Sequence, residues 1–183
     1  MSAKLLYLAR RNPRLSREEF PKRWRKHAAS VGGGAPEVLS EIRSTHYCLV
    51  RPSREVLPAS SDEYDGVGLV RLHGLASIPA MHHHMVTNEI TMADELRTFD
   101  TYVTNFGVFC AEEVVRDGEL AGAALFHFVR RSPGVAPSDF SAAWREAIVM
   151  MSLYAVLSTT AACFCESTSP LYATVGRLNR FSA

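Results

Sequence analysis

Apolar residues recur along this chain at two spacings, which predict strands and helices in alternation. Short apolar or aromatic-rich runs predict strands at Leu5 to Arg10 and Leu125 to Arg130, and in the segments IRSTHYCLV, DGVGLVRLHG, FGVFCAEEVV and STTAACFCE. Apolar residues three and four positions apart predict helices that follow Phe20 and Phe140, and TMADELRTFDTYV is a third helical segment. The first part of the chain therefore has the order β-α-β-β-α-β, the ferredoxin-like pattern.

The first two of these helices each follow a turn that contains proline. Pro13 and Pro133 favour an extended conformation in the residue before them, so each preceding strand is expected to end there. Ser16 and Glu19 have the S-x-x-E spacing of a capping box, in which each side chain bonds the backbone N–H of the other residue. We therefore expect the first helix to begin at Ser16.

The sequence contains an internal repeat, which a shift of 120 residues reveals. LLYLARRNPRLSREEFPKRWR then aligns without a gap with LFHFVRRSPGVAPSDFSAAWR, and both tryptophans of the chain, Trp24 and Trp144, fall in equivalent positions. We expect one complete ferredoxin-like repeat at residues 1–118 and a partial second repeat at residues 119–183. The tail LYATVGRLNRFSA adds at most one more strand to the second repeat, which leaves no room for a full β-α-β unit after its helix.

The predicted fold class is α+β, a ferredoxin-like dimeric α+β barrel. Its antiparallel sheets would pack face to face with helices outside and a cavity between them. Two ways of completing this barrel stay open. Either the partial repeat closes it within one chain, or a second subunit closes it in a homodimer.

Composition and charge narrow the possible partners. Of 183 residues, 47% are hydrophobic and 21% charged, and the formal net charge of +1 gives no overall field that would collect nucleic acid or anionic lipid. The basic residues of RRNPRLSREEFPKRWRKHAA are expected to form the solvated side of a helix. No apolar run is long enough for a secretory or membrane-spanning segment, so we expect a cytoplasmic protein with no nucleic-acid and no membrane partner.

Cofactor and metal motifs are missing from the sequence. The four cysteines are too few for a disulfide framework and lack the spacing of a zinc site, so we interpret them as reduced and structural. There is no G-x-S-x-G elbow, phosphate-binding loop or dinucleotide fingerprint. The sequence therefore predicts no cofactor and no metal.

Three motifs resemble those of a known family. They are RRNPRLSREEFPKRWRKHAA, YDGVGLVRLHGLASIPAM, and ADELRTFDTYV followed by FCAEEVV, which together cover most of residues 4–117. They are similar to EthD-like proteins of the dimeric α+β barrel superfamily. The resemblance implies a cavity for a small organic molecule, no organic cofactor, and dehydratase, decarboxylase or cyclase steps on hydrophobic, polyketide-type substrates. The segment MHHHMVTNEIT departs from that family pattern.

Two histidines are the predicted catalytic residues. His27 lies on the apolar stripe of the first helix, whereas the second repeat has Ala147 at that position, and the resemblance places the polar residue of the cavity there. His46 lies in a predicted strand where the resemblance places a histidine near the cavity mouth. Imidazole exchanges protons near neutral pH, so either residue is a candidate general base. The alternative for both is a structural histidine, which for His27 is one satisfied within the core.

Four further residues are predicted to bind substrate, namely Tyr7, Trp24, His73 and His127. The first strand of each repeat has one face that is more apolar, formed by Leu6 and Leu8 in the first repeat and by Phe126 and Phe128 in the second. We expect this face to pack against the helices. Tyr7 and His127 lie on the opposite face and would then point towards the space between the sheets. The alternative is that their polar ends only reach water. His73 ends the third predicted strand at the rim of the cavity.

Two groups of titratable residues are interpreted without a site. His82, His83 and His84 are adjacent, so they do not converge on one metal ion, and a solvated loop is the expected structure. Asp94, Glu95 and Asp100 match an acidic helix pattern of the EthD-like family, and helix capping and solvation account for them.

The sequence as a whole predicts a cofactor-independent enzyme of the lyase, cyclase or dehydratase type. Its partner would be a small hydrophobic, carbonyl-rich substrate, polyketide-like or aromatic, on which histidine acid–base catalysis drives dehydration, cyclisation or decarboxylation. Two alternatives remain, a cofactor-free monooxygenase and a non-catalytic protein that binds a hydrophobic metabolite.

Overall fold

The computed structural model describes the backbone of residues 2–34, 36–50, 63–116, 123–153, 157–164 and 171–178. The chain divides into two compact units, one formed by Ala3–Phe109 and the other by Met1–Ser2 with Cys110–Ala183. Strand β4 (Gly107–Arg116) begins in the first unit and ends in the second, so this division falls within a strand. Asp117 and Gly118, where the first repeat is expected to end, lie outside the described residues.

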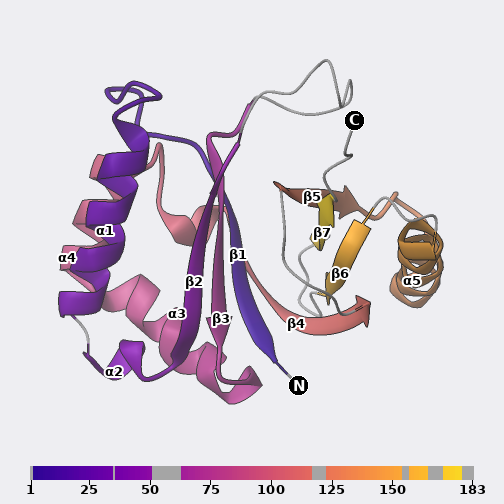
Figure 1. The fold of residues 1–183 in the computed structure, drawn as a ribbon. Coiled ribbons are helices and arrows are strands. Elements are labelled where there is room, and N and C mark those ends of the chain that lie inside the picture. The colour runs from indigo at the N-terminus through magenta and orange to yellow at the C-terminus, as the bar shows by residue number, and fades with distance from the viewer. Residues whose placement is uncertain are drawn as a thin grey trace. The chain divides into compact units, whose positions relative to one another are not determined.

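The first unit has the ferredoxin-like β-α-β-β-α-β order (Figure 1). Its strands lie in the order β2-β3-β1-β4, and β3 is antiparallel to both β1 and β2. This arrangement confirms the predicted α+β class. The elements before β4 are β1 (Ala3–Ala9), α1 (Phe20–Gly34), α2 (Pro36–Leu39), β2 (Ile42–Leu49), β3 (Gly66–Leu72), α3 (Ile78–Thr87) and α4 (Glu89–Thr98), with the 3-10 turns η1 (Leu75–Ser77) and η2 (Val103–Asn105).

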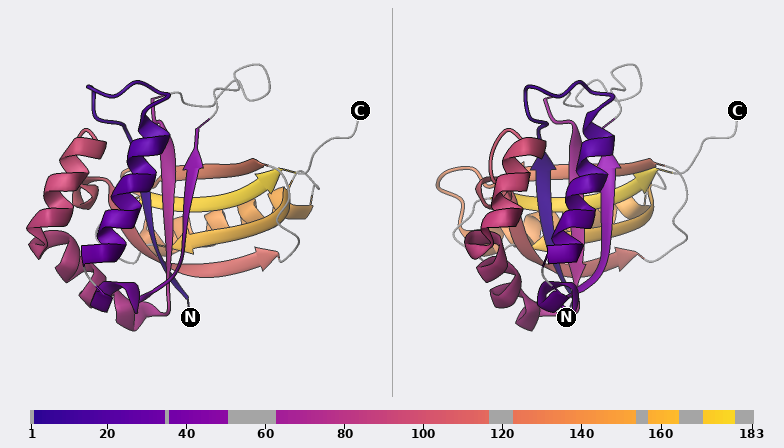
Figure 2. Two further views of the ribbon diagram at one scale, coloured as in Figure 1. Left: turned by 60° about the vertical axis from the view of Figure 1, so that its left-hand side comes forward. Right: turned by 90° about the vertical axis from the view of Figure 1, so that its left-hand side faces the viewer.

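Helices α1 and α4 lie side by side and cover one face of β1, β3 and β2 (Figures 1 and 2). The predicted capping box precedes α1, because Ser16 Oγ accepts from the N–H of Glu19 at 3.2 Å and Glu19 Oε2 accepts from the N–H of Ser16 at 2.8 Å. The helix itself begins at Phe20, after a turn, rather than at Ser16. As expected, Lys22, Arg25 and Lys26 of α1 are exposed. Arg23 is the exception, because its side chain is only 17% exposed and is paired with Asp94.

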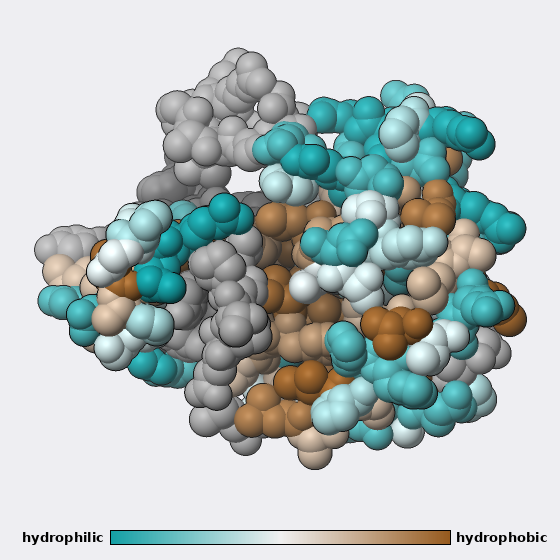
Figure 3. Space-filling view, turned by 180° about the vertical axis from the view of Figure 1, so that it is seen from behind, coloured by the Kyte–Doolittle hydropathy of each residue, from teal (hydrophilic) through white to brown (hydrophobic). Residues whose placement is uncertain are grey.

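Figure 3 shows the solvated character of the loop before α1 from the opposite side. Hydrophilic residues gather over the end of the first unit that carries this loop, in which Arg14, Arg17 and Glu18 are exposed. Within the described part of the chain, no helix has both the length and the apolar character needed to cross a membrane.

The strand parity predicted for β1 is wrong. Leu5, Tyr7 and Ala9 belong to the core under the helices, together with Phe20 and other buried apolar residues. Tyr7 fits there because Gly68 stands opposite it on β3, where a side chain would overlap its ring. Because both faces of β1 are almost entirely buried, the greater apolarity of Leu6 and Leu8 did not distinguish the helix side from the other side.

The second unit repeats the first three strands and the first helix. It contains β5 (Ala123–Arg130), α5 (Pro137–Leu153), β6 (Leu157–Phe164) and β7 (Leu171–Leu178), with the strand order β4-β6-β7-β5. Strand β7 is antiparallel to β5 and β6, as β3 is to β1 and β2. The register shifts between Ile42 and Ser44 in β2 and between Leu157 and Thr159 in β6, an irregularity at corresponding places in the two copies. Helix α5 packs on β6.

Candidate functional site

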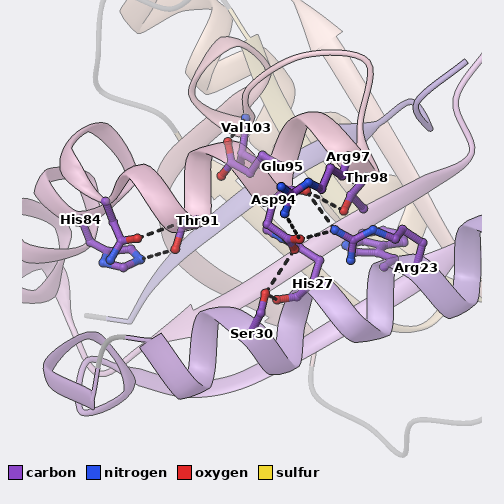
Figure 4. Close-up of polar contacts among 12 residues, drawn as sticks. Arg23, His27, Ser30, His84, Thr91, Asp94, Glu95, Arg97, Thr98 and Val103 are labelled. Carbon is purple, nitrogen blue, oxygen red and sulfur yellow. Dashed lines mark hydrogen bonds and ion pairs between the residues drawn. The ribbon is translucent and has the colours of Figure 1, made fainter. Parts of the chain in front are cut away.

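Residues of α1 and α4 meet in a polar cluster around His27 and Asp94 (Figure 4). His27 lies on the inward stripe of α1, three residues beyond the buried Trp24, and only 5% of it is exposed. Asp94 comes from α4, which is capped by Asn88. The side chain of Asn88 accepts a hydrogen bond from the N–H of Thr91 at 2.9 Å. The Nδ1 atom of His27 lies 2.9 Å from Oδ2 of Asp94.

The carboxylate of Asp94 has several other donors. Arg23 forms an ion pair with Oδ1, and Ser30 Oγ donates to Oδ2 at 3.1 Å. Arg97, one turn along α4, has Nη1 4.0 Å from Oδ1. Asp94 therefore joins three side chains of α1 to α4, and it is itself only 13% exposed.

The electrostatics of this pair favour a charged aspartate and a neutral histidine. Burial alone would raise the pKa of Asp94, but hydrogen bonds from Arg23 and His27 outweigh it and hold the pKa below its usual value. Burial lowers the pKa of His27, although its bond to Asp94 opposes this. A carboxylate only accepts hydrogen bonds, so we assign the proton of the neutral ring to Nδ1. The Nε2 atom is then unprotonated, and it has no hydrogen-bond partner among the described residues.

A second buried acid, Glu95, lies next to Asp94 in sequence but bonds to the segment that follows α4. It is 3% exposed, and its Oε2 accepts a hydrogen bond from the N–H of Val103 at 3.0 Å. Burial raises its pKa to about 7, against the lowering effect of that hydrogen bond. Glu95 is therefore able to change its protonation state near neutral pH.

Two of the predicted binding residues share the aromatic core with His27. The indole Nε1 of Trp24 donates to the hydroxyl oxygen of Tyr7 at 3.2 Å, and both residues are buried. The rings of Tyr7 and His27 contact the same ring, that of Phe99, with centroid distances of 6.0 and 5.4 Å. Burial raises the pKa of Tyr7 far above its usual value, so its hydroxyl keeps its proton. The structure thus brings Tyr7, Trp24 and His27 into one layer.

The other predicted site residues lie elsewhere. His46 is exposed on β2 and stands opposite Leu69 of β3, on the face away from the helices. His73 is exposed just after β3. The two predicted catalytic histidines, His27 and His46, therefore occupy opposite sides of the sheet.

His127 belongs to the second unit, where its predicted direction is also wrong. Val129, two residues along β5, packs with Phe140 and Trp144 around Ile148 of α5. Because alternate residues of a strand share a face, His127 lies on the side that α5 covers. Burial lowers its pKa.

The histidine run is helical, which corrects the expectation of a loop. Residues 82–84 belong to α3, where His82 and His83 are exposed and His84 is buried. Nε2 of His84 lies 3.3 Å from Oγ1 of Thr91, which gives the buried imidazole a polar partner. Within the described ranges, no group of three or more histidine, cysteine, aspartate or glutamate residues could hold a metal ion.

Sequence reasoning missed the acidic half of the cluster. It attributed Asp94 and Glu95 to capping and solvation, which is correct only for the exposed Asp100. The available signal was the spacing of Thr91, Glu95 and Thr98, which are all buried and lie on one stripe of α4. A polar stripe carries no hydrophobic periodicity, and nothing in the sequence pairs Asp94 with α1.

Comparison with known proteins does not identify a family. No protein-family model matches the chain, and no curated protein matches it. The resemblance to EthD-like proteins therefore stays a prediction.

Proposed function

We propose that this protein is a cofactor-independent enzyme that transfers protons on a small, hydrophobic carbonyl compound, with His27 as its general base. The observation that supports this most directly is the contact between Nδ1 of His27 and Oδ2 of Asp94. A carboxylate that binds one ring nitrogen fixes the orientation of the imidazole, leaves the other nitrogen free to accept a proton, and stabilises the imidazolium that forms.

The proposed step is the removal of a proton next to a carbonyl group. The C–H bond breaks, Nε2 of His27 takes the proton, and the electron pair moves to the carbonyl oxygen to give an enolate. The hydroxyl of Tyr7 accepts a hydrogen bond from Trp24 and retains its own proton, which suits it to donate to that oxygen. Loss of a β-hydroxyl group as water, with the proton returned by His27, would then give the dehydration product. Attack of the enolate on a second carbonyl would give the cyclisation product, and reprotonation at carbon would return the ketone with an exchanged hydrogen.

The surroundings of His27 favour an apolar substrate. Its ring packs edge-on against Phe99 within a cluster that contains Trp24 and Phe20. The two cations of the polar cluster, Arg23 and Arg97, both approach Asp94. A neutral ketone is therefore a better match for this layer than a carboxylate or a phosphate.

The test measures exchange of α-hydrogens in deuterated water. Acetophenone and 2-tetralone serve as probes because their exchange is followed directly by proton NMR without a cofactor. We expect wild-type protein to accelerate the exchange of at least one probe and His27→Gln to slow it by about tenfold or more. His83→Gln, which removes an exposed histidine of α3, is the matched control. Equal exchange rates in His27→Gln and wild type would remove His27 from the mechanism.

One further variant and one condition separate the predicted alternatives. If His46→Gln rather than His27→Gln lost the exchange, the reactive site would lie on the face of the sheet away from the helices. Turnover that depends on dissolved oxygen would favour the cofactor-free monooxygenase.

A non-catalytic binding protein is the second candidate, and the burial of His27 favours it. With 5% of the residue exposed and Nδ1 already bonded to Asp94, His27 has the surroundings of a histidine that holds two helices together. In that case mass spectrometry of the purified protein would detect a bound hydrophobic metabolite, no probe would exchange faster than in buffer, and His27→Gln would change only the affinity.

A further inference from the structure

Among the strands that the structure describes, β5 is the edge strand of the second unit. It pairs with β7 through all eight of its residues, and it ends the strand order β4-β6-β7-β5. Its counterpart in the first unit, β1, has neighbours on both sides, β3 and β4. The second unit thus lacks, among its described strands, an equivalent of the strand that flanks β1.

The sequence and register of this strand lack most of the features that usually prevent strands from pairing with other chains. Its sequence, AALFHFVR, carries no proline, and its only Lys, Arg, Asp or Glu residue is Arg130 at the end. The register between β5 and β7 is continuous, without a bulge. Natural edge strands are normally protected by charges, prolines or bulges, so an unprotected edge of this length indicates a partner.

The edge strand of the first unit, β2, shows the protection that β5 lacks. Its register shifts around Arg43, which is exposed, and His46 is exposed as well. One edge of the fold is therefore bulged and charged, whereas the other is regular and apolar.

We propose that β5 pairs antiparallel with β5 of a second copy of the chain. The place next to it is one that a strand fills in the first repeat, so the expected partner is an extended strand, and a two-fold axis supplies an identical one. A two-fold axis perpendicular to the sheet keeps each residue on its own face if it passes level with a residue rather than between two. The two residues in the middle of β5 are Phe126 and His127, so the pairing is expected to centre on one of them. Either centre places the two Arg130 side chains about 20 Å or more apart, at a rise of about 3.4 Å per residue, where salt screens their repulsion.

The first test uses the wild-type chain. Sedimentation velocity over about a hundredfold range of protein concentration should show a monomer–dimer equilibrium. Hydrogen–deuterium exchange at the two ends of that range should show slower exchange in residues 123–130 at the high concentration, with residues 42–49 of β2 unchanged. A monomer at every concentration, or a dimer without added protection in β5, would overturn the proposal.

Paired proline variants provide the second test. Successive N–H groups of a strand point to opposite edges, so one of Phe128→Pro and Val129→Pro removes an N–H that bonds β7 and the other removes an N–H at the open edge. We expect one variant to keep the wild-type circular dichroism spectrum and to be monomeric. The matched pair in β2, Thr45→Pro and His46→Pro, should contain a folded variant that still dimerises. If both β5 variants fold and both still dimerise, the proposal is contradicted. If both β5 variants unfold, the hydrogen–deuterium exchange experiment decides.

Discussion

The imidazole of His27 and the carboxylate of Asp94, 67 residues apart in sequence, are joined by a 2.9 Å contact between α1 and α4. This contact explains why the repeat did not preserve the histidine. The second unit, as far as it is described, contains α5 but no helix equivalent to α4, so Ala147 has no partner to which a histidine could bond. The difference between His27 and Ala147 therefore matches the presence of α4 in the first unit and its absence from the described part of the second, whether or not His27 also transfers protons.

Asp94→Asn should destabilise the protein by about 2 kcal/mol. The amide keeps the volume of the side chain but removes the negative charge to which both Arg23 and His27 bond. Hydrogen bonds to charged groups contribute about 1.5–3 kcal/mol each. Urea unfolding followed by circular dichroism measures the effect as a lower midpoint with an unchanged slope.

The matched control for this variant is Asp100→Asn, which changes an exposed aspartate two residues beyond α4. We expect a loss of less than about 0.5 kcal/mol there. Similar losses in the two variants would mean that the Asp94 cluster contributes no more to stability than a solvated surface charge.

His27 should make the protein less stable in mild acid. Burial lowers its pKa in the folded state, so below about pH 6.5 the unfolded chain takes up this proton more readily than the folded chain. The stability of the wild type relative to His27→Gln should therefore fall as the pH decreases from about 7 towards 5. Urea unfolding of both proteins across this range measures the difference, with His83→Gln as the control for loss of an exposed imidazole.

Glu95 should have the opposite pH dependence. Its pKa is about 7 in the folded protein and 4.5 when unperturbed, so between these values the folded state holds the proton and the unfolded state releases it. Stability then falls as the pH rises from about 4.5 to 7, by up to about 3 kcal/mol in total. Glu95→Gln keeps an acceptor for the N–H of Val103 and should remove this slope. Glu89→Gln, at the exposed start of α4, should retain it.

The order of the elements was predictable from the sequence because it depends on local signals. The capping box of Ser16 and Glu19 and the repeated proline turns act over a few residues, and the structure contains each of them. Alternation in β1 failed as a guide because six of its seven residues are buried, so the apolar pattern has no solvent side.

The candidate site was predictable only on one helix. His27 stood out because an imidazole interrupted an apolar stripe, whereas Asp94 and Glu95 lie on a helix whose buried residues include Thr91 and Thr98. Which acid reaches His27 depends on how α4 packs against α1, a long-range contact that local spacing does not encode. The helical state of His82 to His84 was missed for a similar reason, because three adjacent polar residues mask the periodicity of α3.

Gly68 and Tyr7 provide a test of the packing that places the aromatic layer. They stand opposite each other in the register of β1 and β3, and a Cβ on Gly68 would overlap the Tyr7 ring. Gly68→Ala should therefore destabilise the protein by about 2 kcal/mol or more, the cost of overpacking a filled core. Urea unfolding measures this loss.

A double-mutant cycle separates this steric effect from the loss of a glycine as such. Tyr7→Ala removes the ring, so Gly68→Ala should cost less than about 1 kcal/mol in that background, and the coupling between the two changes measures their contact. Gly134 is the control, because its φ of +86° makes alanine unfavourable there although no atom lies within 4 Å of the added Cβ. Gly134→Ala should have the same effect with or without Tyr7. If Gly68→Ala also cost the same in both backgrounds, Tyr7 would not lie over Gly68, and its place on the helix side of the sheet would be wrong.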